Sequence, residues 1–423
     1  MVIVNPPVGA TVSSVEIPLR REIRVPMRAG RRKLGFQPKC AQERSMGRDK
    51  VFPDGWMGFL EERVRKWLRM GEEPVRGGLE PEMAPDHLVV MVHGLVGSAE
   101  DWKFAAEQFA RRLPHNVIVH LAYFSRNSIS HGSECNATLL TFDGVDLMGE
   151  RLAEEVQSIL NRQSGIRKIS FVAHSLGGLI ARYAIGRLYS PIIKESAHVN
   201  GTPSCKDNVL NSGIAGLVPM NFITFASPHL GSGGHNQLPF LCGLPFLERS
   251  ASEAAHLIVG RTGKHLFLTD SDDGKPPLLI RMAGDDDIKF RSALKSFKRR
   301  VAYANANFDH MVGWRTSSIR RQHELPKYHL LVADENYPHI VYVDKGNAQS
   351  SCGDPISDLE VHKSDLEEDM IRGLTQLNWE RVDVSFQNSK QRYIAHNTIQ
   401  VKSYWLNSDG ADVVSHMIDN FLI

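Results

Sequence analysis

The chain alternates between short, continuous apolar runs and longer segments whose apolar residues recur every three or four positions. The runs at 87–92, Val117–Phe124, 169–172 and Asn221–Ala226 are each of strand length and rich in Val, Ile and Phe. An apolar run without alternation indicates a strand buried on both faces, as in a parallel sheet. Helical spacing is seen between the runs, at Trp102, Ala106, Phe109 and Leu113, and at Leu147, Leu152, Val156, Ile159 and Leu160. This alternation predicts an α/β fold with a mostly parallel, doubly wound sheet.

The second half of the chain continues the pattern less regularly. Three further strands are expected at Leu278–Met282, Arg300–Ala306 and Trp379–Phe386, and a basic helix is expected at Phe290–Lys298. Two segments, at about 188–219 and 232–275, lack clean strand periodicity. We therefore expect them to form caps over the active site.

The run that begins at Lys168 leads into Ala173-His174-Ser175-Leu176-Gly177 and directly on into a helix. A serine at a strand-to-helix turn, with small residues two positions before and after it, is the pattern of a nucleophile elbow. The small residues allow the helix to pack closely on the sheet, and the strained turn exposes the serine oxygen. Ala173 stands where this pattern usually has glycine. The alternative is an ordinary turn in which Ser175 caps the helix without chemistry.

A second element of the same chemistry follows the first strand, which ends at His93-Gly94. In acyl-transfer enzymes of this architecture, one oxyanion-binding N–H comes from the loop after that strand, and another from the residue after the nucleophile. The corresponding residues are Leu95 and Leu176. We expect His93 to brace the loop without transferring protons. The following residues, Ser98–Asp101, have the pattern of a capping box and predict the start of a helix.

Five motifs resemble a known family. They are HGLVGS at 93–98, AEDWKFAAEQF at 99–109, AHSLGGLIARY at 173–183, ITFASPHLG at 223–231 and FDHMVGWRTS at 308–317. They are similar to the eukaryotic serine esterases of lipase-like type, and most of all to the plant members of that family. The resemblance covers roughly Asp86–Ile423 and implies an α/β-hydrolase fold. It also implies ester hydrolysis, with acyl lipids as the expected substrates.

A triad acid belongs in the loop after a late strand, and Asp309 lies in the loop after Arg300–Ala306. The family motif has its acid at the same point. Asp285–Asp287 follow an earlier expected strand and are the competing choice. Three adjacent carboxylates are more typical of a solvated loop, because burying one beside two like charges is costly.

The base is expected last in the chain order Ser, acid, His. Among the histidines after Asp309, His396 alone stands between the last expected strand and the terminal helix. His339 opens a strand rich in Tyr and Val, and His416 lies in the terminal helix, so both are expected to be structural. The predicted chemistry is acyl transfer in two steps. His396 accepts the proton of Ser175 during attack on an ester carbonyl, Asp309 orients the imidazole, and water then releases the acyl group.

No cofactor and no metal are expected, because the sequence has no phosphate-binding glycine loop and no metal-ligand spacing of His, Cys and carboxylates. Two alternatives remain open. An acyltransferase or thioesterase would use the same triad. A non-catalytic binding or scaffold protein would keep the α/β-hydrolase fold without turnover.

The composition supports one catalytic domain, expected at 86–423 of the 423 residues. The net charge of +2 gives no reason to expect a nucleic-acid partner. Residues 1–50 carry 11 Lys and Arg against 4 Asp and Glu. We expect 1–53 to be a disordered basic extension, with an organelle transit peptide, as for plastid import, as the alternative.

The chain has no apolar run long enough for a transmembrane helix and no secretory signal pattern, so an intracellular, most simply cytoplasmic, protein is expected. The 5 cysteines are an odd number without C-x-x-C spacing, which favours free thiols. Free cysteines and the lack of a secretory signal pattern are both typical of proteins in a reducing compartment.

Two apolar segments bear on the substrate. Residues 54–85 combine an amphipathic helix, Asp54–Met70, with a linker rich in Pro and Gly. The apolar stripe of this helix either docks on the core or contacts a membrane surface. A second cluster lies at Leu238–Leu247, where we expect Phe240, Leu244 and Phe246 to bind the acyl chain of a lipid substrate. Packing against the core is the alternative for this cluster.

Overall fold

The computed structural model describes residues 85–113, 115–122, 141–191, 213–232, 260–271, 274–346 and 364–423. They belong to one compact unit, Glu80–Ile423. The expected extension at 1–53, the helix Asp54–Met70 and its linker up to residue 84 lie outside the described residues. Phe240, Leu244 and Phe246 lie outside them as well. No helix in the described part of the chain is long and apolar enough to cross a bilayer.

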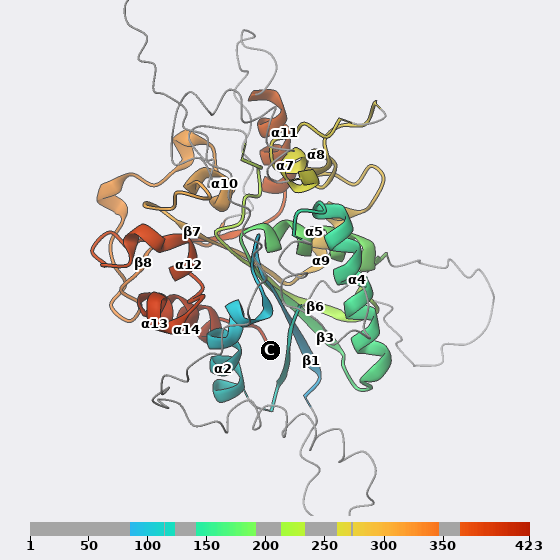
Figure 1. The fold of residues 1–423 in the computed structure, drawn as a ribbon, viewed down its shortest axis with the longest axis horizontal. Helices are drawn as coiled ribbons and strands as arrows, with labels where there is room; N and C mark the ends of the chain where they lie inside the picture. Colours follow the sequence, from blue (N-terminus) through green and yellow to red (C-terminus); the bar gives the residue numbers. More distant parts are fainter. Residues whose placement is uncertain are drawn as a thin grey trace, which may run out of the picture. The chain divides into compact units, whose positions relative to one another are not determined.

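A sheet of seven strands in the order β2-β1-β3-β6-β7-β9-β8 forms the centre of this unit (Figure 1). The strands are β1 (His87–Val92), β2 (Val117–Leu121), β3 (Lys168–His174), β6 (Val218–Phe225), β7 (Arg299–Asn305), β8 (Ile340–Asp344) and β9 (Glu380–Val384). Neighbouring strands are parallel except for β8, which pairs antiparallel with β9 at the edge. This is the α/β-hydrolase fold, as the sequence predicted.

Helices cover both faces of the sheet, which explains the continuous apolar runs. Leu88, Val90 and Val92 of β1 pack in one core cluster, whereas Val89 and Met91 pack in the other. The first cluster is covered by α4 (Val145–Arg162), α5 (Leu176–Leu188), α8 (Leu278–Arg281), α9 (Phe290–Ser296) and α11 (Ser364–Thr375). The second is covered by α2 (Lys103–Arg112), α12 (Ala395–Thr398) and α14 (Ala411–Asp419). A strand enclosed in this way has no polar face, so alternation is absent from its sequence.

One expected strand is wrong: Leu278–Met282 contains the short helix α8. A run of so few apolar residues does not distinguish a buried strand from a buried helical turn. Pro277 stands immediately before α8 and favours the start of a helix. In the sheet, β6 pairs directly with β7, so no position is left between them for another strand.

Smaller differences concern helix starts and the expected cap segments. Ala99–Trp102 form a 3-10 turn, η1, and the side chain of Ser98 makes no capping hydrogen bond, so the capping box is wrong. Leu147, one of the apolar residues whose spacing predicted α4, is 41% exposed. The segment 188–219 contains the paired strands β4 (Tyr189–Ser190) and β5 (Gly213–Ile214) and the start of β6, and the segment 232–275 contains α7 (Gly260–Leu266). Residues 192–212, 233–259 and 272–273 lie outside the described part.

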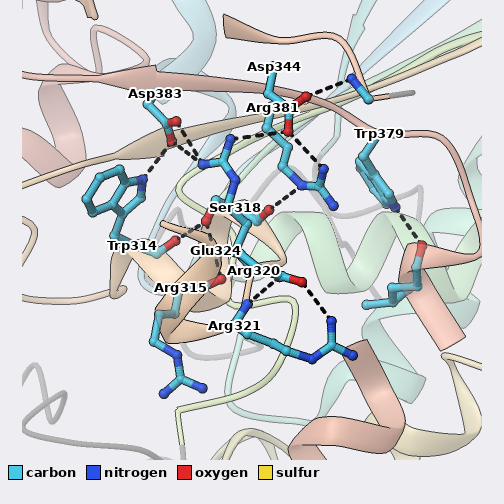
Figure 2. A network of polar contacts seen from close by, with 12 residues as sticks. Trp314, Arg315, Ser318, Arg320, Arg321, Glu324, Asp344, Trp379, Arg381 and Asp383 are labelled. Carbon is cyan, nitrogen blue, oxygen red and sulfur yellow. Dashed lines mark hydrogen bonds and ion pairs between the residues drawn. The ribbon is translucent and has the colours of Figure 1, made fainter. Parts of the chain in front are cut away.

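A buried polar network fixes the chain after β7 to the edge of the sheet (Figure 2). Asp383 of β9 is 0% exposed and accepts hydrogen bonds from Arg320 Nη1 at 2.7 and 2.9 Å and from Trp314 Nε1 at 2.6 Å. Arg381, two residues earlier, donates from Nε to the carbonyl oxygen of Ser318 at 3.1 Å. Helix α10 (Trp314–Ser318) is therefore held against β9 by charge-assisted bonds.

The end of the chain is fastened to the central strand β6 and packs beside β1. Asn221 donates from Nδ2 to the carbonyl oxygen of Leu422 at 2.8 Å and accepts the Leu422 N–H at 3.1 Å. His87 Nε2 lies 2.8 Å from Ser170 Oγ, and its ring stacks on Phe421 at 5.4 Å between centroids. Burial, with a smaller contribution from Lys168, lowers the pKa of His87 to about 4.

His87 should make the fold sensitive to mild acid. Below pH about 6.5 the unfolded chain binds a proton at this residue that the folded chain does not bind until about pH 4, so stability falls as the pH falls. His87→Gln should reduce the loss of unfolding free energy across this window by roughly 3 kcal/mol. Urea unfolding at several pH values measures the difference, with the exposed His323→Gln as the matched control. Parallel curves for wild type and His87→Gln would contradict it.

Candidate active site

Ser175 occupies a strained turn between β3 and α5. Its backbone has φ 54° and ψ −129°. A positive φ is rarely adopted by residues other than glycine. The Ser175 N–H donates to the carbonyl oxygen of Phe225 at 2.8 Å, which continues the ladder from β3 to β6 into the turn. The Ser175 side chain makes no capping bond to α5, so the ordinary helix-cap interpretation does not apply.

Two positions around this turn require glycine, because neighbouring segments of the chain lie too close for a side chain. A Cβ on Gly177 would lie 2.5 Å from the carbonyl oxygen of Val92 and 2.6 Å from that of His93. A Cβ on Gly94 would lie 2.8 Å from Ser175 Cβ. The loop after β1 and the start of α5 therefore pack directly against the serine, which is the steric reason for the small residues of the elbow pattern.

The structure brings Ser175, His396 and Asp309 into one chain of hydrogen bonds. Ser175 Oγ lies 3.0 Å from His396 Nε2, and His396 Nδ1 lies 3.1 Å from Asp309 Oδ2. Asp309 comes from the loop between β7 and α10, and His396 lies in α12, which follows the 3-10 turn η5 (Arg392–Ile394). Ser175 and His396 are 7% and 6% exposed, so both residues are largely buried.

Asp309 is held in its charged form by several donors. Its Oδ1 accepts the N–H groups of Met311 and Val312 at 3.0 and 2.9 Å, and its Oδ2 accepts Asn305 Nδ2 at 2.8 Å. Burial alone would raise the pKa of this carboxyl, but the His396 imidazole and these hydrogen bonds outweigh it and lower the pKa from its usual value. A charged Asp309 can orient the imidazole and stabilise its protonated form.

His174 supports the segment that carries His396. Its Nε2–H donates to the backbone carbonyl oxygen of His396 at 2.7 Å, and the two rings lie 4.6 Å apart between centroids. Burial, and secondarily the nearby His396 imidazole, lower the pKa of His174 well below its usual value. His174 is therefore neutral at physiological pH and acts here as a fixed donor.

The expected oxyanion donors, Leu95 and Leu176, follow directly after Gly94 and Ser175, two residues that are packed together. Leu176 is the first residue of α5, where a backbone N–H has no acceptor within its own helix. Leu95 follows Gly94, the residue packed on Ser175. The Leu95 loop is held by the Val96 N–H, which donates to Thr141 Oγ1 at 3.1 Å. An ion pair at 3.1 Å between Lys402 and Asp101 links the segment after this loop to the segment after His396.

The competing residues lie elsewhere. Asp285 accepts the N–H and hydroxyl of Ser292 at 2.9 and 2.8 Å, and Asp287 pairs with Arg281 at 2.7 Å. His416 Nδ1 lies 2.9 Å from Tyr303 Oη, and His339 pairs with Asp412 at 3.0 Å. These contacts are local or structural, as the sequence indicated for both histidines.

Sequence reasoning missed His174 and Asn305, the two residues that support the base and the acid. Each is the last residue of a strand, His174 directly before Ser175 and Asn305 four residues before Asp309, and this position is the signal that could have found them. Within the described residues, no group of three or more His, Cys, Asp or Glu side chains could hold a metal ion.

Comparison with known proteins assigns this chain to a protein family. A family model described as "Putative serine esterase (DUF676)" matches residues 82–319. The chain is 34% identical over 237 residues to "Putative lipase ROG1" of Saccharomyces cerevisiae, covering 55% of this chain and 28% of that protein. It is 28% identical over 243 residues to "Putative lipase C4A8.10" of Schizosaccharomyces pombe, covering 55% and 26%. The match therefore spans less than a third of either relative.

Solved structures with low sequence identity are also similar. A hydrolase from Oleispira antarctica is 10% identical, covers 82% of this chain and 94% of that chain, and has a TM-score of 0.33. An esterase from Pyrococcus furiosus is 11% identical, covers 76% and 82%, and has a TM-score of 0.32.

His174→Leu should lower the reactivity of Ser175 toward a fluorophosphonate probe by about 10- to 100-fold. The substitution leaves the His396 carbonyl oxygen without its donor, at a cost of roughly 1–3 kcal/mol that loosens the base segment. His174→Gln, which retains an N–H donor, should recover part of the rate. The labelling rate is measured on protein shown by circular dichroism to be folded. An unchanged rate in folded His174→Leu would show that the bond has no influence on Ser175.

Proposed function

The chain belongs to the serine esterase family whose model matches residues 82–319, and from this premise we propose that it cleaves carboxylic esters through Ser175, His396 and Asp309. The observation that carries the proposal is the unbroken hydrogen-bond chain from Ser175 Oγ through His396 to Asp309. Its members are 87 to 221 residues apart in sequence. Nothing in their local sequence requires this meeting, so a catalytic role is the simplest explanation for it.

The geometry suits a two-step mechanism. His396 Nε2 accepts the Ser175 proton as Oγ attacks the ester carbonyl, and the imidazolium then protonates the departing alcohol. Water attacks the acyl-enzyme in the second step, with His396 again as the base. Asp309, already charged, keeps Nδ1 protonated and compensates the charge of the imidazolium.

The backbone N–H groups of Leu95 and Leu176 bind the oxyanion in this proposal. The positive φ of Ser175 places the serine at the first turn of α5, where free N–H groups and the helix dipole favour negative charge. Preorganised donors of this kind are worth a factor of about 10²–10³ each in turnover. Gly94 is essential in this proposal, because any side chain there would displace Ser175.

Acyl lipids are the proposed substrates, hydrolysed to a fatty acid and an alcohol. Two yeast relatives carry the name lipase, and the segment Leu238–Leu247 supplies apolar side chains for an acyl chain. Each buried methylene contributes about 0.8 kcal/mol, so such a segment favours long chains over short ones. Within the family, we propose that this chain is most similar to the plant members, on the basis of its five motifs. A thioesterase or acyltransferase would use the same three residues.

Removing any of the three residues should abolish activity without unfolding the protein. Ser175→Ala and His396→Ala should each reduce kcat by about 10³-fold or more, and Asp309→Asn by about 10⁴-fold through the wrong imidazole tautomer. Asp287→Asn and His416→Ala are the matched controls and should retain most activity. Hydrolysis of a soluble p-nitrophenyl ester and fluorophosphonate labelling measure these effects. A Ser175→Ala protein that keeps its activity would overturn the assignment, and a folded wild type that neither reacts nor labels would favour a non-catalytic protein.

The acyl-chain preference can be tested separately. We expect a higher kcat/KM for p-nitrophenyl esters of about eight carbons or more than for acetyl esters, because longer chains bury more apolar surface. Phe240→Asp and Phe246→Asp should reduce this preference while leaving acetyl ester hydrolysis nearly unchanged. A parallel series of acyl thioesters distinguishes a thioesterase. A preference for acetyl esters that neither substitution alters would point to a small-ester hydrolase.

A further inference from the structure

Five large apolar side chains are exposed on the segment that carries His396. They are Tyr393 (63% exposed), Ile394 (40%), Tyr404 (58%), Trp405 (87%) and Leu406 (51%), and we call them the aromatic rim. Tyr393 and Ile394 end the turn η5 immediately before α12, and the other three belong to the short helix α13 (Tyr404–Asn407). An exposed cluster of this kind is costly in water and marks a binding surface in soluble proteins.

Contacts with two other segments place the rim beside the proposed site. The Tyr404 ring stacks on Phe104, in the helix that follows the Gly94-Leu95 loop, at 5.1 Å between centroids. The Tyr393 ring meets Phe308 edge-on at 5.8 Å, and Phe308 directly precedes Asp309. The rim therefore borders the segments that carry the base, the acid and one oxyanion donor.

The segment that carries the rim is basic, and two acids that contact it, Asp101 and Asp409, are engaged with Lys402 and Ser389. Residues 384–408 contain Lys390, Arg392 and Lys402 but no Asp or Glu. The Arg392 guanidinium lies over the Tyr393 ring, 4.8 Å from its centroid, so a cation and an aromatic face are presented together. Lys402 is engaged with Asp101, whereas Lys390 is exposed.

These features fit an anionic lipid surface better than a second protein. Trp and Tyr prefer the boundary between water and hydrocarbon, and nearby Lys and Arg are attracted to anionic head groups. A stable protein interface uses about 20–30 residues on each side and is depleted of Lys at its core. Five rim residues with basic neighbours are too few for such an interface, but enough to anchor a protein at a membrane surface.

We propose that the aromatic rim docks this protein on an anionic lipid surface, with the segment that carries His396 turned toward the lipid. The partner is the head-group and upper acyl region of a bilayer, which Trp405 and Leu406 enter while Lys390 and Arg392 contact the phosphates. Docking goes beyond the proposed chemistry, because binding does not require a nucleophile and is measurable in its absence.

The test uses the full chain with Ser175→Ala, so that vesicles are not consumed. Sedimentation with phosphatidylcholine vesicles, with and without phosphatidylserine, gives the partition coefficient. Trp405→Ser should weaken partitioning by about tenfold or more. The tryptophan ring would be buried in the bilayer on docking, and the serine variant lacks this apolar surface. Tyr328→Ser, at another position that is 75% exposed, is the matched control and should bind like the parent. Lys390→Glu with Arg392→Glu should remove the preference for phosphatidylserine vesicles and change binding to phosphatidylcholine little.

Three outcomes would overturn the proposal. In the first, the parent protein fails to sediment with either vesicle. In the second, Trp405→Ser and Tyr328→Ser lose binding equally. In the third, binding is kept with Trp405→Ser but lost with Trp67→Ser, in the expected helix Asp54–Met70, which moves docking to the N-terminal segment. A dimer that Trp405→Ser dissociates, without vesicle binding, would assign the rim to a second copy. In a chain that retains Ser175, Trp405→Ser should leave kcat/KM for a soluble short-chain ester unchanged, so docking and chemistry fail separately.

Discussion

The turn at Ser175 imposes the constraint on which the rest of the site depends. A serine at φ 54° costs roughly 1–3 kcal/mol, so the surroundings must hold the backbone there. They do so through the bond from Ser175 N–H to Phe225 O and through the tight approach of Gly177 to Val92 and His93. Both contacts require β1, β3 and β6 to be adjacent and parallel. The sheet order is thus the condition for holding Ser175 in this strained turn.

The parallel sheet also explains why the proposed acid and base meet the serine. Ser175 follows β3 and Asp309 follows β7, and strands that run the same way end at the same edge. His396 arrives from beyond β9 and is fixed by bonds at two places: its backbone accepts from His174 and its Nδ1 faces Asp309. Since His174 is neutral and Asp309 charged, the base lies between a donor and a negative partner.

Buried polar contacts hold one part of the unit together, whereas the aromatic rim is exposed to solvent. The Arg320–Asp383 pair holds the chain after Asp309 to β9, and Asn221 holds the chain end against the central strand β6. Breaking a buried pair such as Arg320–Asp383 leaves an uncompensated charge, so these contacts are costly to disturb. The aromatic rim has few such bonds and remains open to solvent. A firm scaffold with an apolar border beside the serine suits an enzyme that works at an interface.

The sequence by itself determined the features that depend on local pattern. Continuous apolar runs predicted buried parallel strands, and the small residues around Ser175 predicted the turn, because each reflects the immediate environment of its own segment. Asp309 and His396 followed from their positions after late strands, although their catalytic roles remain proposals. The tertiary structure alone decided that 278–281 is helical, since a short apolar run fits either element. It also decided that His174 supports the segment of His396, 222 residues away, that Asn305 bonds to Asp309, and that Trp405 is exposed, because none of these follows from the apolar pattern of its own segment.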